Sequence, residues 1–418
     1  MEGNSINAIV QYAYDHVEYY KEKYSSLGID TKEIKTQQDI ELLPFVSKNI
    51  VQGRHDSFVS DIHQKYPKSE MIEVRRTSGS TGKYLKIFWD RKDNIKSLIP
   101  LWLLRKKYHG ITPNMKWVSF YSVCYDGNKI VNLVDKELDS NGKHLGFSKI
   151  GLTYERIRSI YNDILEFSPE WMLLQPSIAY CIAEVIKNEK LPLPKELKYI
   201  ELNGEYVFDS QRKAIEDVFG IKTVNMYGCN EVNGIAYELP DGKFHIISDN
   251  VVVEVIKDGK PVLDEEGDIY VTSLRNSAMP FIRYETGDRG ILRETETNGK
   301  KEQILELCSG RSSDYVLLEN GEKLNSYVIS NIVEYTNENM STVIKQFRVV
   351  QAAVNKFEVE FVIRSDYSGW KDAVIESFMD NISEPSLKNA EWSFTWKDEI
   401  YPDPNTGKYK FFENKVKQ

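Results

Sequence analysis

Hydrophobic and polar positions recur with a helical period in some segments of the chain and with a strand-like pattern in others. The helical period predicts helices over residues 7–24, 90–108, 154–166, 177–188 and 209–218. Runs rich in Val, Ile, Tyr and Phe predict strands over residues 116–125, 199–202 and 223–226. Because strands that alternate with helices favour a parallel or mixed sheet, this part of the chain is predicted to be α/β.

The pattern changes in the second half of the chain. Short strand-like runs at 251–255 and 268–272, separated by Asp-Gly and Glu-Gly turns, predict a β subdomain within 244–291. Beyond Gly310 the pattern predicts a hairpin over 315–324, helices over 326–336 and 371–381, and strands over 346–353 and 357–363. The predicted fold is therefore α/β, with a large N-terminal domain (residues 1–309) of mixed or parallel sheets flanked by helices, a β subdomain, and a small, separate C-terminal α+β domain (residues 310–418).

Composition narrows the class of protein. The chain has 418 residues, 41% of them hydrophobic, which is enough to bury a full core. Its net charge of −9 argues against a nucleic-acid partner or an anionic membrane surface. The N-terminus lacks the pattern of a signal peptide, and no run is apolar enough for membrane insertion, so we expect a cytoplasmic protein. The four Cys and six His are scattered, and we predict neither a disulfide framework nor a structural metal.

The first candidate for chemistry is a segment of small polar residues and glycines that begins at Thr77. It continues as Ser78, Gly79, Ser80, Thr81, Gly82 and Lys83. Glycines allow successive backbone N–H groups to point inward, and the hydroxyls add donors, so the segment is typical of phosphate binding. It is not a Walker loop, because Thr77 replaces the first glycine and Tyr84 follows Lys83. A polar surface loop is the alternative interpretation.

Further motifs follow in a fixed order along the chain. They are Leu43–Lys48 (LPFVSK), the glycine-rich segment, Asn203-Gly204-Glu205, Tyr227–Glu231 (YGCNE), Arg283–Asp288 (RYETGD), Gly310–Asp314 (GRSSD) and Thr406-Gly407-Lys408. In this order they resemble the adenylate-forming superfamily, particularly its phenylacetate–CoA ligase and capsule-biosynthesis branch. The resemblance extends over nearly the whole chain.

The resemblance implies a ligase that activates a carboxylic acid with ATP, releases pyrophosphate, and passes the acyl-adenylate to a thiol of CoA or of a carrier protein's phosphopantetheine. It implies Lys408 and Glu231 as catalytic residues, with Glu231 holding Mg2+. The implied ATP- or AMP-binding residues are Thr77, Ser78, Gly79, Ser80, Thr81, Gly82, Lys83, Asn203, Gly204, Glu205, Tyr227, Gly228, Asn230, Asp288 and Arg311. Lys408 would bridge the carboxylate and the α-phosphate, whereas Asp288 would accept the ribose hydroxyls.

The resemblance also implies an acyl pocket and a hinge. The candidate pocket residues are Tyr121, Tyr125, Tyr206, Cys229, Asn233, Gly234, Ile235 and Ala236, a mixture that would suit an aromatic or small polar acid. With 25 tyrosines in the chain, core packing is an alternative role for the aromatic members. The hinge would lie at Ser313 and Asp314, and it would make the small C-terminal domain mobile.

Departures from the family pattern leave alternatives open. Asn230 stands where a Thr or Ser usually precedes the magnesium Glu, Tyr84 replaces a proline, Glu285 replaces a frequent Arg, and Ser313 takes the usual hinge Asp position. The acceptor could instead be an amine, and a non-catalytic nucleotide-binding protein or a cell-surface assembly protein are further alternatives. Any carrier protein would be a separate chain. The identity of the acid and the assembly, including a homodimer, stay open.

Overall fold

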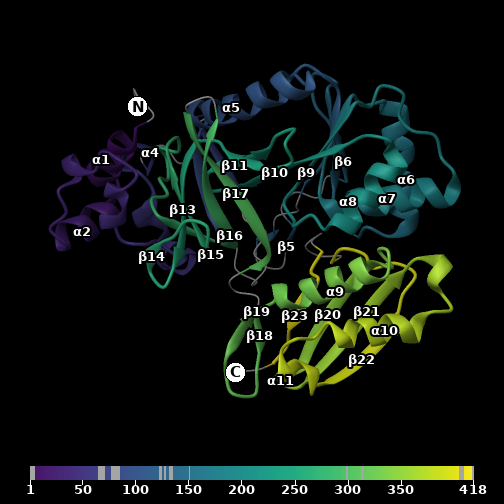
Figure 1. The fold of residues 1–418 in the computed structure, drawn as a ribbon. Helices are drawn as coiled ribbons and strands as arrows, with labels where there is room; N and C mark the ends of the chain where they lie inside the picture. The colour runs from purple at the N-terminus through teal and green to yellow at the C-terminus, as the bar shows by residue number, and fades with distance from the viewer. Residues whose placement is uncertain are drawn as a thin grey trace. The chain divides into compact units, whose positions relative to one another are not determined.

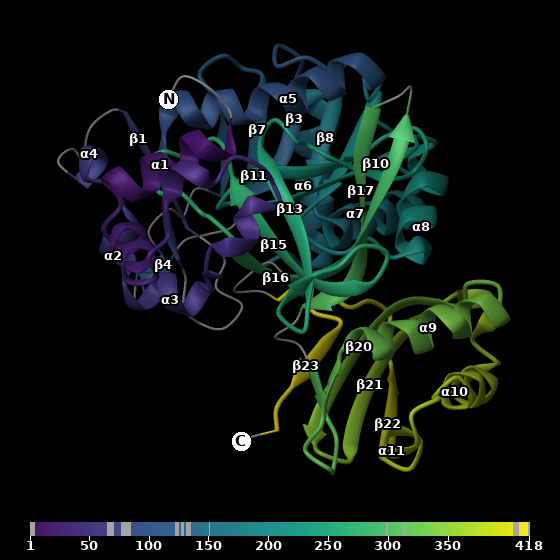
Figure 2. The same ribbon diagram turned by 60° about the vertical axis from the view of Figure 1, so that its left-hand side comes forward.

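The computed structural model describes residues 5–64, 71–76, 85–121, 125–126, 129–130, 135–149, 151–297, 300–311, 315–403 and 409–416 (Figures 1 and 2). Its internal contacts define two compact units. Unit 1 consists of Met1–Met115, Cys124–Val131 and Val224–Leu307, and unit 2 of Lys116–Val123, Asn132–Thr223 and Cys308–Gln418. Both units combine segments that are far apart in the sequence.

Unit 1 begins with short helices and is completed by antiparallel strands. Its helices are α1 (Ile6–His16), α2 (Glu18–Ser26), α3 (Lys48–Gly53), α4 (Asp61–Gln64) and α5 (Arg91–His109). Its strands are β1 (Ile72–Arg76), β2 (Lys86–Asp90), β4 (Tyr125–Asp126), β5 (Lys129–Ile130), β10 (Thr223–Cys229), β11 (Asn233–Glu238), β12 (Phe244–Ile246), β13 (Val251–Lys257), β14 (Lys260–Pro261), β15 (Glu266–Ser273), β16 (Tyr284–Thr297) and β17 (Lys300–Arg311). The strands of its larger sheet follow the order β14-β13-β15-β16-β17-β12-β11-β10.

The core of unit 1 joins the N-terminal helices to this sheet. Apolar side chains of α1 and α2 pack in one cluster with β13, β15 and β16, and the fully buried Trp89 of β2 belongs to the same cluster. Helix α5 lies against β11. It begins after the N-cap Asp90, whose carboxylate accepts the N–H of Lys92, and ends at Gly110 in the left-handed conformation. Within the described residues no helix is both long and apolar enough to cross a membrane.

Unit 2 has a parallel sheet with helices, followed by a smaller α+β part. The first part contains β3 (Trp117–Tyr121), β6 (Lys136–Leu138), β7 (His144–Ser148), α6 (Tyr154–Phe167), β8 (Trp171–Leu174), α7 (Pro176–Glu189), β9 (Tyr199–Asn203) and α8 (Asp209–Phe219). Its strands follow the order β9-β8-β3-β7-β6, and the pairs β9/β8, β8/β3 and β3/β7 are parallel. Alternating strands and helices therefore form the sheet that the sequence pattern predicts.

The smaller part of unit 2 contains β18 (Tyr315–Leu317), β19 (Lys323–Asn325), α9 (Tyr327–Asn339), β20 (Ile344–Ala353), β21 (Lys356–Ile363), α10 (Lys371–Asp380), α11 (Pro385–Lys388), β22 (Glu391–Trp396) and β23 (Phe412–Asn414). Strands β22-β21-β20-β23 form one sheet, and α9 packs against both β20 and α10 (Figure 2). The core between them is rich in Phe and Val side chains.

The predicted fold class is confirmed, and most predicted elements are present. One local prediction differs from the structure. The helix predicted over 7–24 is broken at Val17, whose extended backbone caps α1 and starts α2. The runs predicted to form a β subdomain are strands β12 to β16 of the larger sheet of unit 1. The domain boundary between residues 309 and 310 stays a prediction.

The segment Leu43–Lys48 is anchored to the start of β16 by Arg283. The guanidinium donates to the Leu43 carbonyl at 2.7 Å and forms an ion pair with Glu254 at 2.8 Å, and both ionic side chains are 4% exposed. Val46 exchanges backbone hydrogen bonds with residues 283 and 285. Burial raises the pKa of the Glu254 carboxyl, and the Arg283 guanidinium opposes this rise. The segment that resembles the family's elbow is therefore held by a buried charge pair.

We predict that Arg283→Met destabilises the protein by about 3–5 kcal/mol, because it leaves Glu254 buried without its counter-charge. Urea unfolding measures the change. The double variant Arg283→Met, Glu254→Met should recover much of the loss. The control is Arg293→Met, because Arg293 lies on β16 in exposed ion pairs with Asp264 and Glu306, and it should cost less than about 1 kcal/mol. Equal losses at the two arginines would contradict this account.

Candidate active site

Strands β1 and β2 hold the two ends of the glycine-rich segment. They pair in an antiparallel manner from Ile72↔Asp90 to Arg76↔Lys86, so the segment is the connection of a β-hairpin. The predicted phosphate-binding residues Thr77 to Lys83 themselves lie outside the described residues. The structure therefore describes only the two strands that flank this segment.

The YGCNE motif forms the reversal between β10 and β11. The register of the two strands shifts between Tyr227 and Gly228, and this shift marks a β-bulge. A Cβ built at Gly228 would lie 2.3 Å from the carbonyl oxygen of Asn233, so only glycine allows the two strands to approach this closely. Asn233 has a left-handed backbone with φ 64°. The close approach places Asn230 and Glu231 at the tip of the hairpin.

Glu231 is buried, and its carboxylate is oriented by a tyrosine. The hydroxyl of Tyr284, the first residue of β16, donates to Glu231 Oε1 at 2.9 Å. Burial raises the pKa of Tyr284, and the nearby Glu231 raises it further, so this hydroxyl stays protonated as a donor. Burial and Glu231 also raise the pKa of the Cys229 thiol well above its ordinary value. The described geometry thus joins the YGCNE motif to the RYETGD motif.

The donor chemistry at Glu231 fits a magnesium ion. Mg2+ prefers oxygen ligands and is commonly held by one or two carboxylates together with phosphate oxygens and waters. Within the described residues no group of three or more His, Cys, Asp or Glu side chains could form a protein cage for a metal. Glu231 would supply one carboxylate ligand to such an ion, and the bound ion would supply positive charge at that position.

Asp288 lies beside the aromatic residue of the YGCNE motif. The Tyr227 hydroxyl donates to Asp288 Oδ2 at 2.9 Å, and the Asp288 N–H donates to Thr286 Oγ1 at 3.1 Å. Burial, together with Asp288, raises the pKa of Tyr227 well above its ordinary value. The tyrosine therefore remains a donor that fixes one carboxylate oxygen of Asp288.

In unit 2, the Asn203-Gly204-Glu205 motif follows strand β9 directly. Gly204 has a positive φ of 80°. The Glu205 carboxylate accepts the N–H and the hydroxyl of Ser177, each at 3.0 Å, near the N-terminus of α7. Burial raises the pKa of Glu205, and these hydrogen bonds and the Lys149 ammonium oppose the rise. Glu205 is thus a partly buried structural acceptor in the described geometry.

Tyr409 connects Glu205 to the C-terminal segment that carries the predicted catalytic lysine. The Tyr409 N–H donates to Glu205 Oε1 at 3.2 Å. Its hydroxyl accepts the N–H of Phe347 at 3.1 Å and also contacts the Phe347 carbonyl. Lys408 itself lies outside the described residues, as do the predicted hinge residues Ser313 and Asp314. Tyr409, the residue that follows Lys408, is therefore the first described residue of the C-terminal segment.

For the other predicted site residues, the structure describes either the backbone alone or the side chain as well. Only the backbone is described for Arg311 at the end of β17 and for Tyr125 in β4. In unit 2, Tyr121 is partly buried at the end of β3, and Tyr206 is 39% exposed. The remaining predicted pocket residues of unit 1 are buried on β11: Asn233, Gly234, Ile235 and Ala236.

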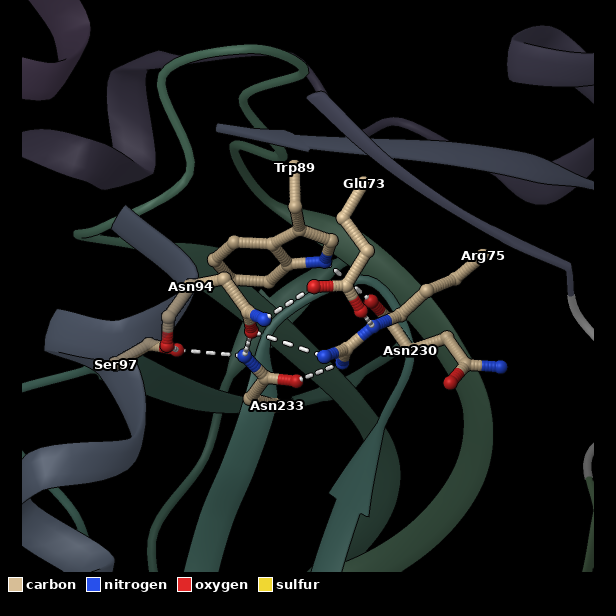
Figure 3. A network of polar contacts seen from close by, with 7 residues as sticks. All are labelled: Glu73, Arg75, Trp89, Asn94, Ser97, Asn230 and Asn233. Atoms are coloured by element: carbon tan, nitrogen blue, oxygen red, sulfur yellow. Dashed lines mark hydrogen bonds and ion pairs between the residues drawn. The ribbon is translucent and has the colours of Figure 1, made fainter. Parts of the chain in front are cut away.

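Several residues of this arrangement were not predicted from the sequence. Tyr284 lies inside the RYETGD motif, and this position could have marked it as a site residue. Ser177 lies on α7 and Lys149 directly follows β7, and no local pattern connects them to Glu205. Arg75 contacts Asn233 at the start of β11, and Trp89 contacts Asn230 at the tip of the β10–β11 hairpin (Figure 3). Both partners lie more than 140 positions away in the sequence, where spacing carries no information.

Comparisons with known proteins agree with this fold. No family model matches the chain. It is 24% identical over 333 residues to a phenylacetate–coenzyme A ligase of Thermus thermophilus, covering 76% of this chain and 71% of that protein. It is similar to a crystal structure of 2-hydroxyisobutyryl-CoA ligase in the postadenylation state, with a TM-score of 0.73, 18% identity and coverage of 97% and 87%. It is also similar to the amide bond synthetase McbA from Marinactinospora thermotolerans, with a TM-score of 0.53, 15% identity and coverage of 81% and 68%.

The chain has the fold of the adenylate-forming superfamily. Within that fold class it is a homologue of the phenylacetate–CoA ligases, at 24% identity. The resemblance that the ordered motifs indicate is thereby confirmed.

The buried Lys149 generates a prediction about pH. Burial lowers the pKa of its ammonium from 10.5 to about 8, although Glu205 opposes this effect. Between these two pH values the unfolded chain binds a proton that the folded chain does not, so the contribution of Lys149 to the free energy of unfolding rises with pH. Relative to Lys149→Met, the wild type should gain up to about 3 kcal/mol over this window.

Urea unfolding from pH 7.5 to 10.5 measures this difference between the wild type and Lys149→Met. The matched control is Lys198→Met, because Lys198 is an exposed partner of Glu170 in the same unit, and its difference from the wild type should stay nearly constant over this pH range. A constant difference for Lys149→Met would show that Lys149 does not titrate in this window.

Proposed function

We propose that the protein activates a carboxylic acid with Mg·ATP to form an acyl-adenylate and pyrophosphate, and then transfers the acyl group to the thiol of coenzyme A. The observation that carries the proposal is the 24% identity to phenylacetate–CoA ligase over 76% of this chain. The structural similarity to 2-hydroxyisobutyryl-CoA ligase in its postadenylation state supports the proposal. The pairs Tyr227–Asp288 and Tyr284–Glu231 supply oriented carboxylates suited to a ribose and to a cation.

In the first half-reaction, a carboxylate oxygen of the acid attacks the α-phosphorus of ATP, and pyrophosphate leaves. Both reactants are anionic, so the site must screen their charge. We assign this task to Lys408 at the carboxylate and α-phosphate and to Glu231 through magnesium. Backbone N–H groups, hydroxyls and one ammonium would hold the β- and γ-phosphates, from Thr77, Ser78, Gly79, Ser80, Thr81, Gly82 and Lys83.

The nucleoside would be held by residues of the RYETGD, GRSSD and Asn203-Gly204-Glu205 motifs. Asp288, fixed by Tyr227, would accept ribose hydroxyls, and Arg311 would contact ribose or phosphate. Asn203 and Gly204 would border the adenine, with Glu205 as their partly buried support. Gly228 and Asn230 would shape the hairpin next to the phosphates.

In the second half-reaction, the thiol sulfur attacks the acyl carbon, the C–O bond to AMP breaks, and the thiol proton is released. We propose that residues 1–309 and 310–418 act as separate domains that pivot at Ser313 and Asp314 between the two half-reactions. A phosphopantetheine carrier protein would present the same thiol chemistry as coenzyme A. The fold shared with the amide bond synthetase McbA favours an amine as the alternative acceptor.

The substrate acid is proposed to be aromatic or small and polar. Tyr121, Tyr125, Tyr206 and Cys229 are the proposed contacts of its acyl group. The buried residues of β11 would support this wall from behind: Asn233, Gly234, Ile235 and Ala236. Tyrosine rings suit an aromatic acid, because they offer large apolar faces with a polar edge.

We predict that Lys408→Ala lowers acid-dependent exchange of labelled pyrophosphate into ATP by about 100-fold or more, because a cation that acts in the transition state is lost. The panel comprises aromatic, hydroxy, amino and short aliphatic acids. Lys410→Ala is the matched control, since it removes a lysine two positions away, and it should retain most of the exchange. Mg·ATP binding, measured by equilibrium dialysis, should change little in either variant.

Two results would contradict the proposal. Equal exchange in the Lys408→Ala variant and the wild type would remove Lys408 from the chemistry. Binding of Mg·ATP without exchange for any acid of the panel would favour a non-catalytic nucleotide-binding protein. Among acceptors, coenzyme A should yield a thioester, and amide formation with an amine but no thioester would favour the alternative.

A further inference from the structure

Arg75 links three elements of unit 1 through its guanidinium (Figure 3). It lies on β1, two positions before Thr77. Its Nε donates to Glu73 Oε1 at 2.8 Å, its Nη2 donates to Asn94 Oδ1 on α5 at 2.9 Å, and its Nη1 donates to Asn233 Oδ1 on β11. The planar fork of arginine is thus used in several directions at once, which a lysine cannot reproduce.

Asn233 completes the network from the other side. Its Nδ2 donates to Asn94 Oδ1 at 3.0 Å and to Ser97 Oγ at 2.5 Å, and its Oδ1 accepts from Arg75. Asn94 Nδ2 in turn donates to Glu73 Oε2 at 2.7 Å. The Asn233 side chain is buried, and both ends of its amide are engaged within the protein. Asn233 therefore acts on the site through Arg75 and Asn94 and leaves contact with an acid to other residues.

Trp89 provides a second link to the same hairpin. Its indole N–H donates to the carbonyl oxygen of Asn230 at 2.9 Å, and the Arg75 guanidinium lies 5.9 Å from the centre of its ring. Trp89 is on β2, which leaves the glycine-rich segment, whereas Arg75 is on β1, which enters it. Each of the two strands that flank this segment is therefore tied to the hairpin that carries Glu231.

We propose that Arg75 is a positioning residue that, with Asn233 and Trp89, sets the position of β1 and β2, the strands that flank the glycine-rich segment, relative to the hairpin that carries Glu231. This inference rests on the proposed function, in which the segment binds the β- and γ-phosphates and Glu231 holds the magnesium ion between them. Because one Mg·ATP would contact both groups, a change in their separation acts on nucleotide binding and on the adenylation step. The acid would be bound by other groups, and its apparent affinity should be unaffected.

The first test compares Arg75→Lys with the wild type in pyrophosphate exchange. The charge is retained and the fork is lost, so we expect KM for ATP to rise about tenfold and kcat to fall by about 10- to 100-fold, as for a small misplacement of reacting groups. KM for the acid should stay within about twofold of the wild-type value, a change well below the tenfold change expected for ATP. Arg293→Lys, the same substitution in a more exposed pair on β16, should leave all three constants unchanged.

The second variant, Asn233→Gly, separates the side chain from the backbone. Glycine keeps the left-handed φ without strain and removes the side chain with its amide. It should reproduce the higher KM for ATP of Arg75→Lys. A merely structural network predicts a different result, in which the melting temperature and the active fraction fall while both KM values stay at their wild-type values. That result would overturn the proposal.

Mg·ATP affinity without acid, measured by equilibrium dialysis on the full chain, separates this inference from the proposed function. If the wild type binds Mg·ATP but supports no exchange, the proposed function fails, and a Kd about tenfold weaker in Arg75→Lys still supports the positioning role. An equal Kd in the wild type and Arg75→Lys overturns the positioning role even if exchange is observed. If the wild type binds no Mg·ATP, both proposals fail together.

Discussion

The close approach of the β10 and β11 backbones at Gly228 is the constraint on which the described site depends. Any side chain there would meet the carbonyl of Asn233 at 2.3 Å. The tight reversal turns Asn233 into the left-handed region and places its amide in the network around Arg75. It also presents Glu231 to the hydroxyl of Tyr284. A single steric condition therefore fixes the neighbourhood of the carboxylate that would bind magnesium.

Buried tyrosines orient the carboxylates of unit 1 by the same physical means. Desolvation raises the pKa of Tyr227 and of Tyr284, so each keeps its proton and donates to one oxygen of its partner, Asp288 or Glu231. A neutral donor orients a carboxylate without cancelling its charge, which suits carboxylates that are proposed to bind a ribose or a cation. Glu254 differs from these two carboxylates, because it forms a buried ion pair with Arg283. We assign this pair to the stability of the fold.

The sequence predicts local elements well and long-range pairs poorly. Helix α6 matches its predicted range closely because it is amphipathic and begins at Thr153, whose hydroxyl caps the Arg156 N–H. The break at Val17 was missed because the apolar period continues across it. The motif order identified Glu231 and Asp288, but Arg75 and Trp89 reach the hairpin across 158 and 141 positions. Such contacts depend on tertiary packing, for which a single sequence has no local signature.

The central claim is that a carboxylate oxygen attacks the α-phosphorus of ATP, and an isotope measurement tests it most directly. An accepted acid labelled with oxygen-18 in both carboxyl positions is incubated with Mg·ATP, coenzyme A and the protein, and the nucleotide product is analysed by mass spectrometry. The account predicts AMP that carries one labelled oxygen, because the attacking atom stays with phosphorus when the thiol displaces AMP. Unlabelled AMP, or ADP with the label in inorganic phosphate, would contradict it.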